Sequence, residues 1–545
     1  MFRKTDTAQQ VSLLSSVFQY LTGDSSKQFT DETAWQNIFY KQVVRRIDEN
    51  LFSILFSSDN GAPNAPIRTL IGMMILKEGE GYSDQKLFEN CHFNLLTRKA
   101  LGLVNIDDPV PAASTYYLLR KRITGYHKET GIDLFEKTFQ KITKGQIIDF
   151  EVSGQSIRMD SKLIGSNIAF YSRYELIHKS LVLFYKHTCK KQFELLSDQE
   201  RAELDEFVTE KSSATVYRST KSQIKERLIS LGKLIYKILN TVPESDDAHY
   251  QTLKRVFGEQ YKILDDNKIE ITPDKEITAK SVQSPYDTEC DFRIKTGKKT
   301  KGYNHNVTET CDSTNPINLI TDTQTAPATH PDNKFTEPAI KNSQEILSDK
   351  IENAHTDGAY NSEENQTFTK EEDINFYLTG FQGPTGQYDL TIKNGEVQVY
   401  DNQTNTQIPV TVTKNNKYRI KTKTGYRYFT DKQIESCRLR KQAEQLPKEI
   451  RNKRNNVEAT IFQLAYHLRK DKTKYRSLFK NKIWAIIRSL WINFIRIASN
   501  LIKGSQKIQA NVQNALYFSC FVNFIFLVFN LMRLESYKKL KLQII

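Results

Sequence analysis

The spacing of the strand patterns constrains the fold more than any other feature of this sequence. Residues 1–145 have mainly helical patterns, and strand patterns begin only at about Gly154. A helical, charged stretch over 178–285 interrupts the strands, which resume with "GYNHNVTETC", "INLITDTQT", "HTDGAY" and "INFYLTGF". This order predicts a mixed α/β fold, in which a helical domain precedes a core sheet that carries a helical insertion.

The first predicted strand lies in "SIRMDSK", and its expected last residue is an aspartate, Asp160. Ile157 and Met159 alternate with polar residues, as they do in a strand with one face in the core. Ser161 and Lys162 are expected to form the turn that leaves the strand, with Lys162 at most a nearby phosphate contact. A surface strand end would also explain Asp160, so its interpretation as a metal ligand depends on partners elsewhere.

Two further carboxylates are candidate partners. Asp357 in "NAHTDGAYNSEEN" follows a strand-like run and precedes Gly358, although an Asp-Gly pair can simply cap the next helix. Glu458 flanks a helical apolar stripe made of Val457, Ile461, Leu464, Ala465 and Leu468. An exposed i,i+4 pair between Arg454 and Glu458 is the alternative interpretation of that position.

Together, Asp160, Asp357 and Glu458 predict a site for two divalent metal ions. Three carboxylates can hold two metals about 4 Å apart for an in-line phosphoryl transfer. Their hard oxygen ligands favour Mg, with Mn as a substitute, and the lack of His/Cys ligand clusters in the sequence argues against zinc.

The charge distribution indicates a polyanionic partner. The chain has a formal net charge of +14, and residues 414–482 alone hold 21 Lys and Arg against six Asp and Glu. A block of this density favours a phosphate-contacting surface over a solvated face. The six cysteines are scattered without a CxxC pair, which predicts a reducing cytosol.

The regions on either side of the predicted core add further expectations. In 69–103 a Gly-containing break and the Ser83-Asp84 cap separate two helices, and Ser114 is expected to cap a third that ends at Arg120 and Arg122. This pattern suits DNA binding, although small helical bundles share it. Residues 385–430 contain a hairpin joined through Asn394-Gly395. The apolar stretch 514–532 favours a buried or partner-facing helix over a membrane span, because asparagines interrupt it.

Taken together, "RMDSKLIGSNIA", "LITDTQTAPAT", "HTDGAY" and "NNVEATIFQLAYHLRKDKTKYRS" resemble the DDE transposases of bacterial insertion sequences, specifically the branch named after insertion sequence eleven-eighty-two. The resemblance covers roughly residues 50–500 in chain order. It implies an RNase H-like catalytic core with Asp160 on its first strand, Asp357 after its fourth and Glu458 on a late helix.

The resemblance also assigns DNA contacts, with departures. Related enzymes often place Tyr seven residues before the Glu, Arg four before it and Lys seven after it. Arg454 fits, whereas the Tyr position holds Arg451 and the Lys position holds Ala465. The residues expected to contact phosphates are Arg454, Arg451, His467, Lys470, Lys472, Arg120 and Arg122.

The resemblance implies a Mg-dependent transposase that cleaves the ends of its element and transfers them to target DNA. The expected domains are a helical DNA-binding domain (1–145), a catalytic core (146–384 plus 431–505) with a helical insertion (178–285), a β-rich insertion (385–430) and a tail (506–545). Expected partners are double-stranded terminal inverted repeats, target DNA and a second copy of the chain, in a bacterial, nucleoid-associated cytoplasmic setting. Membrane association, which only the apolar stretch 514–532 suggests, is the less favoured alternative. The alternative is an inactive, transposase-derived DNA-binding protein.

Overall fold

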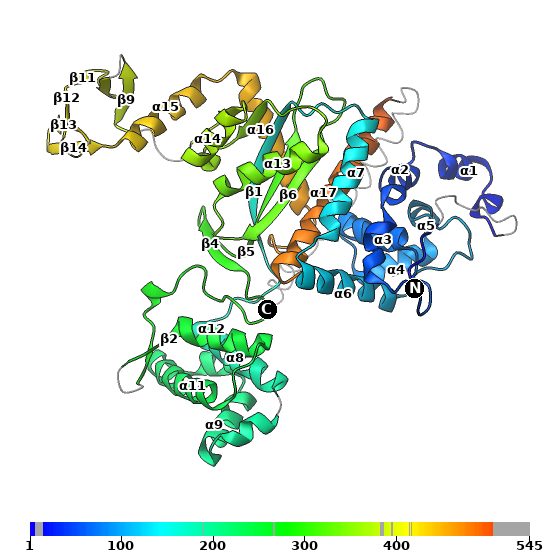
Figure 1. Cartoon of the computed structure of the whole chain (residues 1–545), viewed down its shortest axis with the longest axis horizontal. Coiled ribbons are helices and arrows are strands. Elements are labelled where there is room, and N and C mark those ends of the chain that lie inside the picture. The colour runs from blue at the N-terminus through cyan, green and yellow to red at the C-terminus, as the bar shows by residue number, and fades with distance from the viewer. Residues whose placement is uncertain are drawn as a thin grey trace, which may run out of the picture.

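A six-stranded mixed sheet lies at the centre of the molecule, with long helices packed beside it (Figure 1). The computed structural model describes residues 1–5, 15–188, 190–264, 268–381, 386–393, 396–413, 415 and 417–504. The predicted mixture of helix and sheet is confirmed. The apolar stretch 514–532 and the Asn394-Gly395 turn lie outside the described residues.

The central sheet combines antiparallel and parallel strands. Its order is β4-β5-β1-β7-β8, and β6 also pairs with β5. β1 is antiparallel to β5 and parallel to β7, which is parallel to β8. The strand bounds are β1 Ser156–Gly165, β4 Asp291–Lys295, β5 Lys298–Thr310, β6 Ile320–Pro327, β7 Asn353–Thr356 and β8 Asn375–Leu378.

Helices dominate the chain before β1. They are α1 Gly23–Thr30, α2 Trp35–Gln42, α3 Ile67–Glu80, α4 Asp84–Phe93, α5 Leu95–Ala100, α6 Ala113–Thr130 and α7 Leu134–Asp149. Ser83 caps α4 as expected, because its side chain accepts a hydrogen bond from the Lys86 N–H. Ser114 does not cap α6, which begins one residue earlier after Ala112 and has no side-chain cap.

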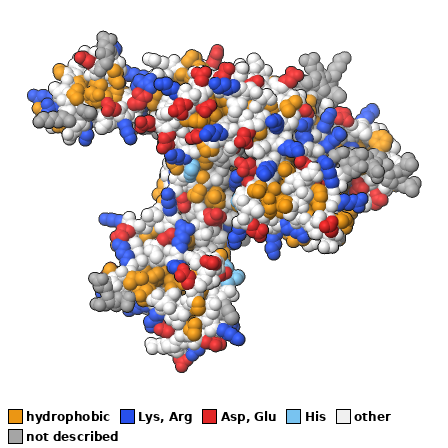
Figure 2. Space-filling view, in the orientation of Figure 1, with side chains coloured by type: hydrophobic (Ala, Val, Ile, Leu, Met, Phe, Trp, Pro, Cys, Tyr) orange, Lys and Arg blue, Asp and Glu red, His pale blue; other side chains and the backbone are white. Residues whose placement is uncertain are grey.

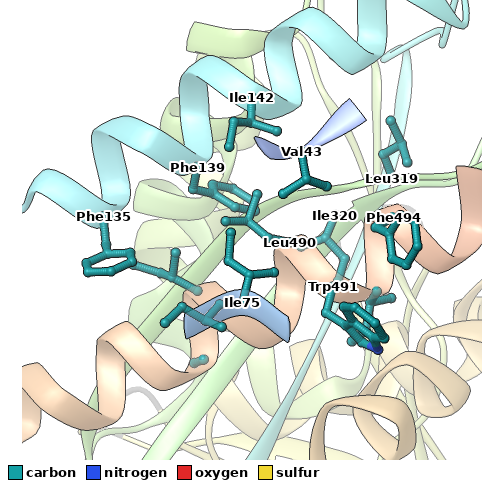
Figure 3. Packing of buried hydrophobic residues seen from close by; sticks show 14 of the residues in the cluster. Val43, Ile75, Phe135, Phe139, Ile142, Leu319, Ile320, Leu490, Trp491 and Phe494 are labelled. Carbon is teal, nitrogen blue, oxygen red and sulfur yellow. The ribbon is translucent and has the colours of Figure 1, made fainter. Parts of the chain in front are cut away.

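One long helix, α17 (Leu478–Gly504), joins this helical domain to the sheet. It packs against β6, α3, α7 and α2. Figure 3 shows Leu490, Trp491 and Phe494 of α17 among apolar residues of the helical domain and β6. Within the described residues only α17 is long and apolar enough to cross a membrane, yet 67% of its most apolar window is buried inside the protein.

The close packing of α17 on α3 requires a glycine. A Cβ atom at Gly79 would lie 2.1 Å from a ring carbon of Trp491, so the indole of α17 occupies the space of a side chain. The buried Arg488 of α17 donates hydrogen bonds to the carbonyl oxygens of Glu78 and Gly79 at 2.7 and 2.9 Å and to that of Leu464 at 3.1 Å. The helical domain and the core are therefore one packed unit at this seam.

A second apolar core lies in the helical insertion between β1 and β4 (Figure 1). The insertion contains α8 Arg173–His187, α9 Asp198–Thr209, α10 Ser212–Arg218, α11 Lys221–Thr241, α12 Ala248–Gln260, β2 Tyr261–Ile263 and β3 Ile269–Ile271. Its first helix begins at Arg173, before the expected boundary at 178.

A β-rich arm, comprising β9 to β14, projects from the core at the upper left of Figures 1 and 2, above the helical insertion. It forms two three-stranded sheets around a small apolar core. Its strands are β9 Tyr388–Lys393, β10 Glu396–Asp401, β11 Gln407–Ile408, β12 Val410–Val412, β13 Tyr418–Thr422 and β14 Gly425–Phe429.

The remaining α-helices are α13 Thr336–Ile346, α14 Glu363–Glu371, α15 Asp431–Gln445 and α16 Lys448–Ala465. Short 3₁₀ helices connect the elements at Val17–Tyr20, Val44–Arg46, Glu49–Leu55, Lys190–Leu195, Asp274–Glu276, Asp332–Phe335 and Gly358–Tyr360 (η8).

A buried ion network fixes α16 and α17 to the sheet. Glu309 of β5, whose side chain is 0% exposed, contacts Arg158 of β1 at 2.5 Å and Arg496 of α17 at 2.7 Å. Thr460 of α16 donates to the same carboxylate at 2.7 Å. Burial alone would raise the pKa of Glu309, but the two arginines hold it below its usual range. Glu309 is therefore ionised and paired at neutral pH.

We predict that Glu309→Ala destabilises the core by about 3–5 kcal/mol, because it leaves two arginines near the sheet without their counter-charge. The matched control is Glu337→Ala, which removes an exposed i,i+4 partner of Lys341 and should cost at most about 1 kcal/mol. Urea unfolding followed by tryptophan fluorescence measures both, since Trp35, Trp484 and Trp491 all lie in or against the main core. Equal unfolding midpoints for the two variants would contradict the prediction.

Candidate active site

Asp160 lies in the middle of β1 rather than at its end. β1 continues through Gly165, which pairs with Gly302 of β5, so Ser161 and Lys162 do not form a turn. Pairing with β5 keeps the strand extended, whereas pairing with β7 stops at Arg158. The carboxylate therefore extends from β1 just beyond the point where its parallel neighbour has ended.

Asp357 follows directly after β7 and has a structural role as well as a candidate catalytic one. Its carboxylate accepts a hydrogen bond from the Ala359 N–H at 2.8 Å and caps η8. The next residue must be small, because a Cβ atom at Gly358 would lie 2.2 Å from the Gly380 carbonyl oxygen. This tight turn holds the carboxylate at the end of β7.

Glu458 is carried to the edge of the sheet by α16, which contacts β1, β5 and β7. The apolar stripe behaves as expected: Val457, Ile461 and Leu464 are buried. Glu458 itself lies on the flank of that stripe, with 60% of its side chain exposed. The side chain thus faces solvent where α16 packs against the middle of β1 and the end of β7.

The three carboxylates converge on the guanidinium of Arg454. Its Nη2 atom lies 3.5 Å from Asp160 Oδ2 and 3.7 Å from Asp357 Oδ2. Its Nη1 atom lies 3.3 Å from Glu458 Oε1. The i,i+4 pair between Arg454 and Glu458 is therefore present, and the same arginine also contacts the other two acids. Residues almost 300 positions apart in the sequence meet at one positive charge.

Burial makes Asp160 an unusual carboxylate. Desolvation raises its pKa to about 6, and Asp357 adds to the increase, while Arg454 and the Ser161 N–H oppose it. Tyr360 of η8 lies beneath the acids, fully buried, and donates a hydrogen bond to Asn306 at 2.6 Å. Its hydroxyl stays protonated, because burial raises its pKa well above the usual value.

The donor set suits a hard divalent cation, since three carboxylates face one centre of positive charge. In this structure, however, the three carboxylates face the guanidinium of Arg454. Within the described ranges, no group of three or more His, Cys, Asp and Glu side chains is arranged to hold a metal ion. A metal would therefore take over the charge-neutralising position that the guanidinium occupies, and binding would require Arg454 to move.

The predicted DNA-contacting residues do not gather at one place. Arg451 lies on the exposed side of α16, one turn before Arg454, and Lys470 lies in an exposed turn with a φ of 54°. The ring of His467 packs against the backbone of Gly81. Lys472 donates to the Ile168 carbonyl and lies over the ring of Phe170.

The two predicted arginines of α6 differ in exposure. Arg120 lies over the rings of Tyr116 and Tyr475, at 5.6 and 5.5 Å from their centroids. Arg122 is exposed and lies over the ring of Phe56, 4.9 Å from its centroid. Arg120 is therefore part of the seam between the helical domain and the core.

Sequence reasoning missed the residues that support the site from beneath. Arg158 donates to the Lys453 carbonyl at 2.8 Å and so ties α16 to β1 one residue before Arg454. Its partner Glu309 stands directly opposite it in the β1–β5 register. Arg158 and Glu309 are both visible in strand-like runs, but only the register, which the sequence does not contain, shows that they pair.

We predict that Asp160 makes the protein less stable as pH rises. Its folded pKa of about 6 lies above the usual 3.8, so the folded state holds its proton more tightly and loses that advantage between roughly pH 4 and 6. Asp160→Asn removes this titration. In metal-free buffer the variant should gain stability relative to wild type, by roughly 2–3 kcal/mol at pH 7 and little at pH 4. Thermal melts across that range measure the difference, and a pH-independent difference would contradict the prediction.

Comparison with known proteins adds one finding. Neither the curated proteins nor the solved structures contain a match to this chain. Residues 27–122, which run from α1 to α6, match the family model described as a transposase domain (DUF772). This match supports a transposase role for the chain, with the DNA binding that such a role entails.

Proposed function

We propose that the chain is a DDE transposase of a bacterial insertion sequence, which cleaves the ends of its element and joins them to target DNA. The observation that carries this proposal is the convergence of Asp160, Asp357 and Glu458 on one guanidinium. The transposase-domain match supports it independently, because that match covers a different part of the chain.

An RNase H-like core is part of the proposal, and the strand order supports it. Counting the core strands in chain order as β1, β5, β6, β7 and β8, Asp160 lies on the first and Asp357 follows the fourth. Glu458 lies on a helix after the β-rich arm. These are the places that the resemblance assigns to the three acids. β4 extends β5 beside the attachment of the helical insertion.

In the proposed mechanism, the three carboxylates would hold two Mg ions, or Mn as a substitute. When bound, the ions supply charge neutralisation and activation of the attacking water or 3′-hydroxyl. The chain's own residues position the reaction: β1 and β7 fix two carboxylates rigidly at neighbouring strand positions, and α16 brings the third. Asp160 must lose its proton to act as a ligand, which its raised pKa permits at neutral pH.

Arg454 would have two roles in this scheme. Before DNA binds, it neutralises the carboxylates and prevents their mutual repulsion. With DNA in place, its planar, bidentate guanidinium suits a phosphate group. The exposed cations Arg451 and Lys470 would extend that contact. The helical domain would recognise the terminal repeats, and a second copy of the chain would be needed to join two ends.

We predict that Asp160→Asn abolishes strand cleavage in Mg while leaving DNA binding largely unchanged. The substitution keeps the shape of the side chain and removes an anionic ligand. Asp357→Asn and Glu458→Gln should behave alike. Cleavage of supercoiled DNA that carries the element's ends measures activity, and gel shift measures binding.

A suitable control for that experiment is Asp373→Asn. This acid is 97% exposed, and its φ of 58° is one that Asn adopts readily. The control should cleave like wild type. Cleavage by Asp160→Asn at the wild-type rate would exclude the assignment. Absence of cleavage by the wild-type protein itself, with binding intact, would favour the inactive DNA-binding alternative.

We also predict that Arg454→Gln increases the stabilisation of the protein by Mg. In the absence of metal, the variant leaves three carboxylates without their shared counter-charge, so its melting temperature should fall below that of wild type. Added Mg then meets no competing guanidinium, and the melting temperature should rise by more than it does in wild type. Equal Mg-induced shifts in the two proteins would show that Arg454 and the metal do not compete.

A further inference from the structure

Two adjoining cavities lie at the seam between the helical domain and the core. Their volumes are about 540 and 500 Å³. They meet at Arg120, Tyr475 and Lys480, which line both, and the two together are called the groove below. One wall comes from α3, the start of α4 and α6. The other comes from residues 474–487, which lead into α17. In Figure 1, α6 lies beside the first turns of α17, where His127 and Phe479 stack at 3.7 Å.

The two acids in this groove, Glu78 and Asp84, have partners inside the protein. Lys77, which is almost fully buried, contacts Asp84 at 2.6 Å and Glu78 at 3.6 Å. Tyr117 donates a hydrogen bond to Asp84 at 2.8 Å, and Tyr475 donates one to Glu78. Both carboxylates therefore belong to an internal network of one lysine and two tyrosine hydroxyls.

The cations of the groove outnumber these two acids, and Arg120 alone among the six described next lies in the electrostatic range of Asp84 and Glu78. Six line it in addition to Lys77, and within the described part of the chain none of the six forms an ion pair: Arg120, Lys121, Lys128, Lys474, Arg476 and Lys480. Three of these side chains make contacts with neutral groups. Arg120 lies over two tyrosine rings, Arg476 lies over a third and bonds the Asn167 carbonyl, and Lys474 bonds the Tyr82 carbonyl.

Such contacts hold a cation in place without cancelling its charge. Arg120 is fixed between Tyr116 and Tyr475, and the lysines at the rim, Lys121, Lys128 and Lys480, are exposed. A concave surface with several fixed, unneutralised positive charges attracts a polyanion with regularly spaced charges. The apolar floor, which includes Trp484 and Phe135, excludes water beneath those charges and strengthens them.

We propose that this groove binds the sugar-phosphate backbone of duplex DNA. The inference rests on the proposed function and deepens it, because it places the main DNA contact at the seam rather than on α16. The groove lies at a suitable separation from the acids. Asn167, which lines it, is seven residues after Asp160, and seven extended residues span at most about 23 Å. A duplex turn measures about 34 Å, so this edge of the groove and Asp160 are separated by less than one turn of DNA.

The segment that forms the core-side wall is also tied directly to the acid-bearing strand. The N–H of Gly165 donates to the Asp471 carbonyl at 2.8 Å, and the N–H of Thr473 donates to the Gly165 carbonyl at 2.9 Å. DNA bound against Lys474 and Arg476 would therefore be fixed in position relative to β1.

The test is the salt dependence of binding to a random 30-base-pair duplex, measured by fluorescence anisotropy in metal-free buffer. The variant Lys121→Ala/Lys480→Ala removes two exposed rim charges, one from each wall. If both contact phosphates, the slope of log affinity against log salt should decrease by about 1.8 in magnitude. Affinity at 0.1 M salt should fall by at least about tenfold.

Two further variants make the result specific to the groove. Lys221→Ala/Lys233→Ala removes the same charge from exposed positions on α11 of the helical insertion and should bind like wild type. Lys121→Arg/Lys480→Arg keeps the charges and should retain the wild-type slope. Equal losses in the groove and α11 variants would overturn the inference, as would a loss in the arginine variant equal to that in the alanine variant.

The outcome is separable from that of the proposed catalysis. Groove-dependent binding without cleavage by the wild-type protein in Mg would overturn the catalytic proposal alone. Cleavage by the wild-type protein, together with DNA affinity that the Lys121→Ala/Lys480→Ala variant leaves unchanged, would overturn the groove inference alone.

Discussion

The pairing of Glu309 with Arg158 and Arg496 is the interaction on which the candidate site depends. These side chains come from β5, β1 and α17, and Thr460 adds α16 to the same carboxylate. Two further hydrogen bonds act on α16 in the same sense, from Arg158 to the Lys453 carbonyl and from Arg488 to the Leu464 carbonyl. Hydrogen-bonded charges cannot slide, since a small displacement would leave buried charges unpaired. The network thereby sets where Arg454 and Glu458 stand relative to Asp160 and Asp357.

The same principle of charge balance connects the acid site with the groove at the seam. At the site, three carboxylates share one arginine, so negative charge is in excess and the site attracts cations. In the groove, seven Lys and Arg side chains stand against two acids, Glu78 and Asp84, so positive charge is in excess. In the proposed function, the groove would bind the backbone phosphates of DNA and the acids would bind the divalent ions. The Arg488 contacts between α3, α16 and α17 keep the two surfaces in one rigid frame.

The sequence predicts local features well and spatial relations less well. The mixed fold, the Ser83 cap and the apolar stripe of α16 follow from short-range patterns and are present. The expected strand end at Asp160 is wrong, because strand length is decided by pairing with β5, whose register lies over a hundred residues away. For the same reason the Arg158–Glu309 pair could not be foreseen. The charge block over 414–482 indicated a basic surface, but not that Lys474 and Lys480 would join α6 in one groove.

The position of the helical insertion has a consequence for how the chain reaches this state. β1 and β5 are neighbours in the sheet, yet the insertion separates them by more than a hundred residues. Closing a disordered loop of that length costs about 4 kcal/mol in chain entropy. The insertion has its own apolar core, and its two ends are joined where Ser166 hydrogen-bonds to Asp287, which also accepts from Tyr303 of β5. Once folded, it shortens the effective loop to a few residues. A folded insertion therefore lowers the entropic cost of pairing β1 with β5, the pairing that keeps the strand extended through Asp160.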